Sequence, residues 1–323
     1  MSSAIPAHPK VSVIIPIYGK AGDLPRLIEA LQAQTLRPHE IILVDSSPKP
    51  IDSPPPGARL VKNPVDVALS WDYNLGAKEA SGDHILNLQQ DCVPEDKTAL
   101  ERMMKQLHEV PGRVSVVALV TLPEENFRQY NFWGQVLMAR WVGRIRQGIS
   151  GKFDLHRAEV YRGIGGYDTD RFHFAGEDMD LFLRLSACGE VLVSDVAVIH
   201  YHAQNRPVRC RDVVKKHFQL AESFGALFRK WGLALRRIPY AGHWTHHLAK
   251  FLYPVVLLVP LFPLPALLAL LVGANLANLE TLRIRHWKTF ALLPWVNVLL
   301  VLAGLAGTLR GLLTGRQRYS VNK

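Results

Sequence analysis

The stretch 165–185, GGYDTDRFHFAGEDMDLFLRL, holds the residues whose types and spacing could do chemistry. Glu177, Asp178 and Asp180 precede apolar residues that recur at helical spacing, so a helix is predicted to begin at these carboxylates. The dipole and the unpaired amides of a helix N-terminus stabilise ionised carboxylates there. An ionised carboxylate at a loop–helix junction can act as a general base, although an isolated pair of this kind is more often only a helix cap.

The elements that would position such a base start with a strand–helix–strand order. Residues 11–17 (VSVIIPI) and 40–45 (EIILVD) are apolar β-branched runs typical of strands buried on both faces, and 24–34 has helical spacing. This order predicts a parallel pair with a right-handed crossover, and ligands of such sheets bind beyond the carboxyl ends of the strands. Asp45 occupies such an end. The glycine pattern of a dinucleotide-binding dehydrogenase is missing after the first strand, and so is the Gly-rich, Arg-containing loop of a sugar nucleotidyltransferase.

Composition restricts the partners and the compartment. With 323 residues and 48% hydrophobic content, the chain can hold one sizeable domain and a smaller unit. The net charge of +10 predicts anionic partners, but no nucleic-acid-binding module is recognisable, so no nucleic acid is expected. Three scattered cysteines predict no disulfide framework and no zinc site, and they fit a reducing compartment. Residues 1–10 lack the apolar stretch of a signal peptide and are predicted to be a flexible N-terminus.

Four motifs, in order, resemble those of glycosyltransferase family 2. They are the opening 11–47, the NLG at 74–76, the QQDCVP at 89–94, and the GGYD turn followed by the ED pair. The resemblance covers roughly residues 11–202. It implies an α/β fold of the GT-A type, in which a Rossmann-like nucleotide-binding half joins an acceptor half on a mainly parallel mixed sheet. The catalytic domain is predicted at residues 11–235.

On the donor side, the resemblance implies that a nucleotide-diphosphate sugar binds at the strand ends. Asp45 would contact the base and ribose, and Asn74 would flank the nucleotide unless it is an ordinary polar helix residue. Two positions depart from the family pattern, because Ser46 stands where a second Asp is common and Tyr73 where an Arg is common. The predicted donor-binding residues are Pro16, Tyr18, Asp45, Asn74 and Gln90.

The motif at 89–94 resembles the family's metal-binding DxD motif, in the Q-D-x-x-P form of rhamnosyltransferase-like members. Gln89 replaces the first Asp, so Asp91 would hold a divalent cation, Mg²⁺ or Mn²⁺, on the donor diphosphate. One carboxylate can suffice for Mg²⁺, since this ion keeps several waters. In some relatives a strand-end histidine completes the site, and His200 matches it better than His202. The alternative is that this chain has lost the family's metal site and binds no cation here.

On the acceptor side, the resemblance implies that Asp178 is the catalytic base and Glu177 its neighbour, with Gly165, Gly166 and Asp180 shaping the acceptor side. Asp178 would take the proton of an acceptor hydroxyl as that oxygen attacks the anomeric carbon, which inverts this centre. The acceptor would be lipid-linked or a nascent polysaccharide, and the process would belong to cell-envelope polysaccharide synthesis.

Two alternatives to this activity remain open. One is a nucleotide-sugar-binding protein on the same fold that lacks catalysis, and the other is a transferase to a polyprenyl phosphate. Residues 135–141 do not have the spacing of the QxxRW motif of processive synthases, so a non-processive enzyme is predicted.

The C-terminal region 236–323 predicts association with membrane lipids. Residues 251–277 and 290–309 are nearly uncharged and long enough to span a bilayer. Four prolines break the first segment, so a two-helix anchor and a kinked re-entrant first segment both stay open. The protein is predicted at the cytoplasmic membrane, with its catalytic domain on the cytoplasmic side.

Two basic segments precede this region. Residues 206–237 are rich in Arg and Lys and are predicted to form helices against a phosphate-rich surface. Residues 126–149 mix aromatic and basic side chains at helical pitch. They predict an amphipathic helix that lies either at a membrane interface or against the catalytic core.

Overall fold

A mixed β-sheet forms the centre of the computed structural model, which describes residues 9–19, 24–63, 69–145, 148–173, 175–201, 207–238 and 249–317. Within these residues the sheet has nine strands in the order β3-β2-β1-β4-β8-β6-β9-β5, and β7 pairs with β6. The strands are β1 (Val11–Ile17), β2 (Glu40–Asp45), β3 (Arg59–Lys62), β4 (His84–Asn87), β5 (Cys92–Pro94), β6 (Arg113–Leu122), β7 (Gly143–Ile145), β8 (Asp154–Arg157) and β9 (Glu190–His200).

The first half of the sheet is parallel, as the strand–helix–strand pattern predicts. β1 pairs in parallel with β2 and with β4, and β2 pairs in parallel with β3. The second half mixes directions, because β8 runs antiparallel to β4 and to β6, whereas β6 and β9 are parallel. The carboxyl ends of β1, β2 and β4 therefore meet at one edge of the sheet, where ligands of such sheets bind.

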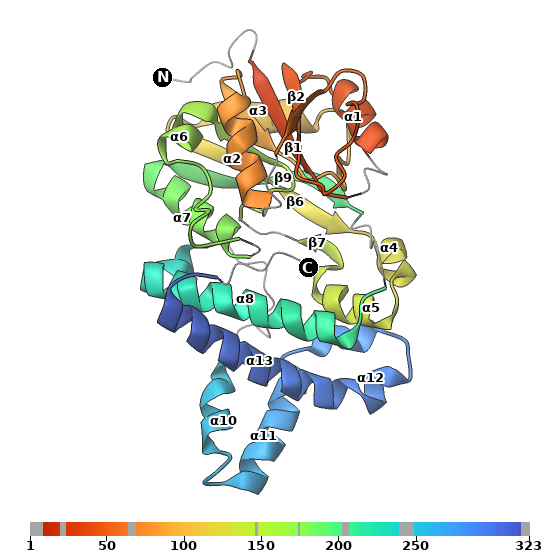
Figure 1. The fold of residues 1–323 in the computed structure, drawn as a ribbon, viewed down its shortest axis with the longest axis vertical. Coiled ribbons are helices and arrows are strands. Elements are labelled where there is room, and N and C mark those ends of the chain that lie inside the picture. The colour runs from red at the N-terminus through yellow and green to blue at the C-terminus, as the bar shows by residue number, and fades with distance from the viewer. Residues whose placement is uncertain are drawn as a thin grey trace.

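Helices cover both faces of the sheet (Figure 1). α1 (Leu24–Gln32) and α3 (Ala99–Glu109) share one apolar core, and α2 (Leu69–Glu79), α6 (Ala158–Gly163) and α7 (Glu177–Cys188) share the other. Side chains of β1 alternate between the two cores, with Val13 and Ile15 in the first and Ile14 in the second. Full burial of each such side chain stabilises the fold by roughly 1.5–3 kcal/mol.

Beyond the sheet, α8 (Cys210–Trp231) and α13 (Leu293–Thr314) lie side by side (Figure 1). Glycine allows the close approach, because a Cβ on Gly307 would meet the carbonyl oxygen of Phe218 at 2.5 Å. Arg310 of α13 pairs with Glu222 of α8, which is 1% exposed. The Arg310 side chain is 37% exposed, so water screens the pair in part, but the pair still offsets the buried charge of Glu222 and links the two helices.

α10 (Tyr253–Leu258) and α11 (Pro263–Leu276) form a hairpin that projects away from α8 and α13 (Figure 1). Pro254 and Pro263 lie in the first turns of these helices, where proline is tolerated. The prolines thus divide the first apolar segment into two short helices. The 14 residues of α11 give a length of about 21 Å, which is shorter than the ~30 Å hydrocarbon core of a bilayer.

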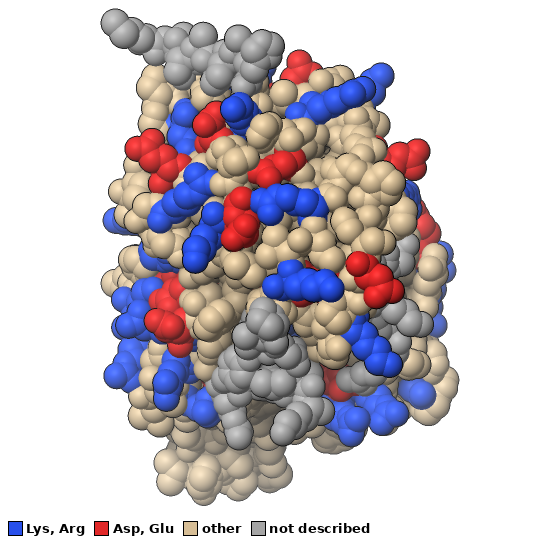
Figure 2. Space-filling model, turned by 45° about the horizontal axis from the view of Figure 1, so that its top comes forward, with Lys and Arg blue, Asp and Glu red and all other residues tan. Residues whose placement is uncertain are grey.

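The surface of the hairpin is apolar. Leu264 is 79% exposed and Leu261 is 71% exposed. Figure 2 shows Lys and Arg side chains on both flanks of the lower half of the molecule, above an uncharged end. Among the described residues, one helix, α13, has the length and the apolar composition to cross a membrane, and a third of its most apolar window is buried inside the protein.

The predicted amphipathic segment differs from the one observed. Its described residues, 126–145 and 148–149, form short pieces rather than one helix, and their aromatic side chains pack with α8 and α13, so the core-packed alternative holds in a broken form. β9 is irregular, because its register shifts twice where it pairs with β6. Pro94 ends the edge strand β5, where its missing N–H is tolerated, and α3 begins at Ala99. The remaining helices are α4 (Glu124–Gln129), α5 (Phe132–Met138), η1 (Ala139–Trp141), η2 (Gly232–Arg237), η3 (Leu279–Arg283) and α12 (Lys288–Ala291).

Candidate active site

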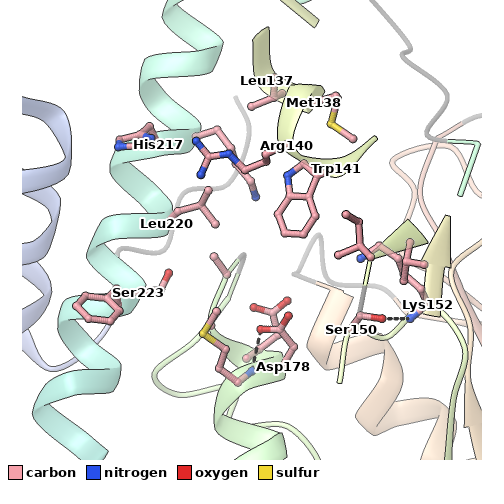
Figure 3. A pocket seen from close by; sticks show the side chains of 18 of the residues that line it. Leu137, Met138, Arg140, Trp141, Ser150, Lys152, Asp178, His217, Leu220 and Ser223 are labelled. Carbon is pink, nitrogen blue, oxygen red and sulfur yellow. Dashed lines mark hydrogen bonds between the residues drawn. The ribbon is translucent and has the colours of Figure 1, made fainter. Parts of the chain in front are cut away.

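A cavity of about 870 Å³ lies between the sheet edge and the helices α7 and α8 (Figure 3). The carboxyl ends of β1 and β4 line one end of it, the first turn of α7 lines the middle, and α8 with the C-terminal helices lines the other end. Of the predicted site residues, those that line the cavity are Pro16, Tyr18, Gln90, Asp91, Glu177, Asp178 and His200. Those that lie behind its walls are Asp45, Asn74, Gly165, Gly166 and Asp180.

Glu177 and Asp178 open α7 in the middle of the cavity. The preceding Gly176 has a φ of 83°, and a Cβ there would come within 2.9 Å of Ser223 on α8, so glycine lets the two helices approach. Asp178 Oδ1 accepts a hydrogen bond from the amide of Met179 at 2.8 Å, and the side chain points into the cavity (Figure 3). Glu177 Oε2 is buried and has no hydrogen-bond partner among the described residues.

The pKa values of both carboxyls are raised. Burial is the main cause for each, and the neighbouring charge of Asp178 helps to raise the pKa of Glu177 to about 7. Lys152 and Lys216, which also line the cavity, act in the opposite direction. A carboxylate with a raised pKa is more basic than an ordinary one, which suits a general base.

Asp91 and His200 meet at the sheet end of the cavity, because β5 pairs with β9. His200 Nε2 lies 3.3 Å from Asp91 Oδ2. The thiol of Cys92 belongs to the same cluster, whose ligand atoms lie within 4.8 Å of one another, but a soft sulfur ligand suits Mg²⁺ or Mn²⁺ poorly. A carboxylate and an imidazole that share a cavity fit a divalent cation whose other ligands are water and phosphate oxygens. The second predicted histidine, His202, lies outside the described residues.

Tyr18 and Gln90 join the ends of β1 and β4. The amide of Tyr18 donates to Gln90 Oε1 at 3.1 Å, and Gln90 Nε2 donates to the carbonyl of Tyr18 at 3.4 Å. This reciprocal pair holds the loop after β1 next to Pro16 at the cavity edge. The ring of Tyr18 is 43% exposed and so is accessible for stacking on a nucleotide base.

Asp45 and Asn74 hold the walls of the cavity in place. Asp45 is fully buried, and its carboxylate accepts from the amides of Ser47 and Ile51 at 2.9 and 2.7 Å. Asn74 Oδ1 accepts from the amide of Tyr167 at 2.8 Å, and its Nδ2 donates to the carbonyl of the same residue at 2.9 Å. Asp45 therefore shapes the loop after β2, and Asn74 ties α2 to the GGYD turn.

The glycines of that turn are required by this contact. Gly165 and Gly166 have φ values of 78° and 63°, in the left-handed region that favours glycine. A Cβ on Gly166 would lie 2.2 Å from Asn74 Oδ1, so a side chain there would break the link to α2.

Asp180 anchors α7 to α8. Its carboxylate is fully buried and accepts from Arg184 Nε, one turn further along the helix, at 2.7 Å. It also accepts from Lys230 Nζ at 2.6 Å and from Trp231 Nε1 at 2.8 Å. All of these donors hold the helix that carries Asp178 rather than facing the cavity.

Asp72 is a cavity residue that the sequence pattern does not single out. It lies on α2 beside Ser46, whose hydroxyl donates to Asp72 Oδ2 at 2.8 Å, and Asn63 Nδ2 donates to its other oxygen at 2.8 Å. Burial raises its pKa to about 6. The carboxylate of Asp72, from α2, thus lies next to Ser46, which follows β2. The only sign of Asp72 in the sequence is that an acid precedes the NLG motif by two residues.

Comparison with known proteins gives consistent matches. The model of the family "Glycosyl transferase family 2" matches residues 12–162. The O-antigen biosynthesis protein RfbC of Myxococcus xanthus is 29% identical over 232 residues, which cover 61% of this chain and 18% of that protein, so the chain spans less than a fifth of it. The O-antigen chain rhamnosyltransferase RfbN of Salmonella typhimurium is 23% identical over 216 residues, which cover 61% of this chain and 67% of that protein.

One solved structure matches almost the whole chain. It is the mannosyltransferase PcManGT of Pyrobaculum calidifontis in complex with GDP-Man and Mn²⁺, with a TM-score of 0.57 and 16% identity over 94% of this chain and 87% of that one. At this identity the match concerns the fold, and it includes the C-terminal helical layer as well as the sheet.

Proposed function

This chain belongs to glycosyl transferase family 2, and on that premise we propose that it moves a sugar from a nucleotide-diphosphate donor to a hydroxyl of a lipid-linked or polysaccharide acceptor. Its fold is the GT-A fold expected from the sequence. The transfer is non-processive and inverts the anomeric carbon. The observation that carries the proposal is one cavity that joins the Asp91–His200 pair to the Glu177–Asp178 pair.

In this mechanism Asp178 is the general base. Its side chain lies in the first turn of α7 and lines the cavity, and the bonds of Asp180 fix the helix that carries it. The acceptor oxygen loses its proton to Asp178 while it attacks the anomeric carbon, and the bond to the donor phosphate breaks on the opposite side. Burial and the charge of Asp178 keep the pKa of Glu177 raised, and burial raises the pKa of Asp178 and so makes it a stronger base.

Asp91 and His200 would hold the divalent cation that the family uses. The short distance between their ligand atoms and their position at the sheet end, next to Tyr18 and Gln90, support this assignment. When bound there, the cation supplies positive charge for the departing diphosphate. At this end of the cavity, Gln90 holds the loop after β1 in place through its hydrogen bond with Tyr18. This loop orients the donor so that the acceptor attacks from the side of Asp178.

A thermal-shift screen tests the function as a whole. The detergent-solubilised protein is heated with UDP-, GDP- and dTDP-sugars, each with Mg²⁺, Mn²⁺ or EDTA. A donor at a hundredfold excess over its Kd stabilises the fold by about 2.7 kcal/mol, so one nucleotide class should raise the Tm only with a divalent cation. Acceptor-dependent release of the nucleoside diphosphate should follow. Donor binding without any release would instead support the non-catalytic alternative.

We also propose that the protein sits on the cytoplasmic face of a membrane by a re-entrant hairpin. The exposed apolar surface of α10 and α11, the short length of α11, and the basic flanks above them support this arrangement. α13 would lie along the interface, because its contact with α8 runs over most of its length. Nucleotide sugars are made in the cytoplasm, so their use as donors supports a position on the cytoplasmic face.

Charges on the hairpin are expected to release the protein from membranes. A charged residue costs about 2.5–3.5 kcal/mol at the bilayer centre, so the double substitution Leu264→Asp and Leu268→Asp should move most of the protein to the soluble fraction. Flotation with anionic vesicles measures this. Val110→Asp, on a similarly apolar but distant exposed residue of the sheet domain, is the matched control and should float like the wild type. Flotation of the double variant at wild-type levels would contradict the hairpin model.

A further inference from the structure

The turn 149–152 forms a wall of the cavity and carries a lysine, Lys152, at its end. Figure 3 shows Lys152 beside Ser150, across the cavity from Ser223 of α8. Lys152 is half-buried, and its neighbours Ile149 and Ser150 line the same cavity. None of the four family motifs includes this lysine, although it lies in the cavity that holds the candidate base.

Buried groups hold this turn in place. Asp154 Oδ2 accepts hydrogen bonds from the amides of Ser150 and Gly151 at 2.7 and 2.5 Å. The hydroxyl of Tyr73, which is 1% exposed, donates to the carbonyl of Gly151 at 2.5 Å. Gly151 has a φ of 69°, and a Cβ there would lie 3.1 Å from the Tyr73 ring. The protein itself therefore fixes the backbone that carries Lys152, as a precise binding site requires.

The register of the sheet places Lys152 at the diphosphate end of the cavity. β8 runs antiparallel to β4, with Asp154 opposite Asn87. The same register, carried two residues further, brings Lys152 opposite Gln89, and both residues line the cavity. Gln89 precedes Asp91 by two residues and stands where the family's metal-binding motif commonly has its first Asp. Lys152 thus lies beside the motif that would hold the donor diphosphate.

The charge of Lys152 acts on both functional pairs of the cavity. Burial raises the pKa of Asp178, and the charge of Lys152 is the largest influence that opposes this rise. In the metal-binding cluster, burial and the charge of Asp91 raise the pKa of the Cys92 thiol, and Lys152 again acts in the opposite direction. Lys216 acts on the base pair from α8. Lys152 is therefore within electrostatic range of the base and of the metal-binding cluster, and the bond that breaks in the reaction must lie between these two.

Two positions that commonly bear charge in the family are neutral in this chain. Tyr73 stands where an Arg is common, and its hydroxyl is bound to Gly151. Gln89 stands where an Asp is common, which leaves one carboxylate fewer to attract a divalent cation. Both changes reduce the positive charge that the protein and its cation can bring to a diphosphate at this end of the cavity.

We propose that the Lys152 ammonium contacts the departing diphosphate of the donor and supplies part of the positive charge that the transfer needs there. The acceptor proton moves to Asp178 and neutralises it, while the electrons of the bond between the anomeric carbon and the diphosphate oxygen stay with the diphosphate. Lys152 then faces a neutral Asp178 on one side and the new negative charge on the other. This stabilises the transition state more than the bound donor. The inference rests on the proposed function for the identity of its ligand.

Calorimetric titration at saturating Mn²⁺ tests the contact, with UDP, GDP and dTDP and with the matching nucleosides uridine, guanosine and thymidine as probes. For the diphosphate that the wild type binds, Lys152→Gln should weaken binding by about 10–100-fold, the scale of a lost charge-assisted hydrogen bond. Lys152→Met, which keeps the length of the side chain without its charge, should act alike, and Lys152→Arg should retain most of the affinity. Binding of the nucleoside should stay within a few-fold. Lys105→Gln, on the exposed face of α3, is the matched control and should bind like the wild type.

Turnover gives the second readout. Both neutral variants should lower kcat by about 10²-fold, the scale of a lost donor to a developing negative charge, while the affinity for Mn²⁺ without nucleotide stays unchanged, because an ammonium is no metal ligand. Wild-type affinity for the diphosphate in both neutral variants overturns the contact, and so does an equal loss for diphosphate and nucleoside. These results would leave donor binding by the wild type intact. A wild type that binds no nucleoside diphosphate with Mn²⁺ would overturn the proposed function together with this inference.

Discussion

Replacing Asp178 with asparagine is expected to lower kcat by about 10²–10⁴-fold, the range that a general base contributes, with little change in the KM for the donor. The substitution keeps the size of the side chain and an oxygen that can accept from the amide of Met179, so α7 should begin as before. Steady-state kinetics with the donor identified by thermal shift measures the effect. Turnover within a few-fold of the wild type would rule out this assignment.

The pH profile separates this role from a structural one. Since burial raises the pKa of both carboxyls, that of Glu177 to about 7, the acid limb of kcat/KM should lie well above the ordinary values of 3.8 and 4.5. Activity is lost below that limb, because the base is then protonated. Glu177→Gln should leave the limb in place, because burial rather than the charge of Glu177 raises the pKa of Asp178. A limb that moves to lower pH in this variant would show that Glu177 sets it instead.

The sheet and its first helices could be predicted from the sequence because the signals are local. β1 and β2 are apolar β-branched runs, and the NLG motif requires its glycine: a Cβ on Gly76 would lie 2.3 Å from Ile14 Cγ2. The segment 126–149 was predicted as one helix because its aromatic and basic residues recur at helical pitch. Its actual course depends on contacts with α8 and α13, which are far away in the sequence.

The residues of the candidate site can also be divided into those that a local pattern predicts and those that only tertiary contacts place. The carboxylates of α7 could be predicted because a helix start is a local pattern, and Asp91 because the motif around it resembles the family's metal-binding motif. The partners of Asp45 and Asn74 could not, since an acid or amide at a strand end or on a helix can face a ligand or bind backbone equally well. Here both bind backbone amides. Asp72, Lys216 and Arg140 reach the cavity through tertiary packing alone, and no spacing in the sequence marks them.

Loss of the Asp91 carboxylate is the second change with a large expected effect. Asp91→Asn should lower kcat/KM by about 10²-fold or more at a fixed Mn²⁺ concentration and weaken Mn²⁺ binding in the presence of nucleoside diphosphate, because a neutral amide is a much poorer ligand than a carboxylate. The backbone carbonyl of Asp91, which accepts from the amide of Tyr201 at 2.9 Å, is untouched, so the fold should persist. Paramagnetic resonance of free Mn²⁺ measures the binding.

His200→Ala should also weaken Mn²⁺ binding, by about 10–100-fold. The effect should be smaller than that of Asp91→Asn, because a neutral imidazole attracts the cation less strongly than a carboxylate does. Cys92→Ala is the matched control within the same cluster. Its buried thiol is a soft ligand that suits Mn²⁺ poorly, so the substitution should leave the affinity for Mn²⁺ within a few-fold of the wild type while costing some stability through the small void. Chelation with EDTA should abolish the activity of the wild type, and Mn²⁺ or Mg²⁺ should restore it. Full activity after exhaustive chelation would show that the reaction needs no metal at this site, whatever the results for the variants.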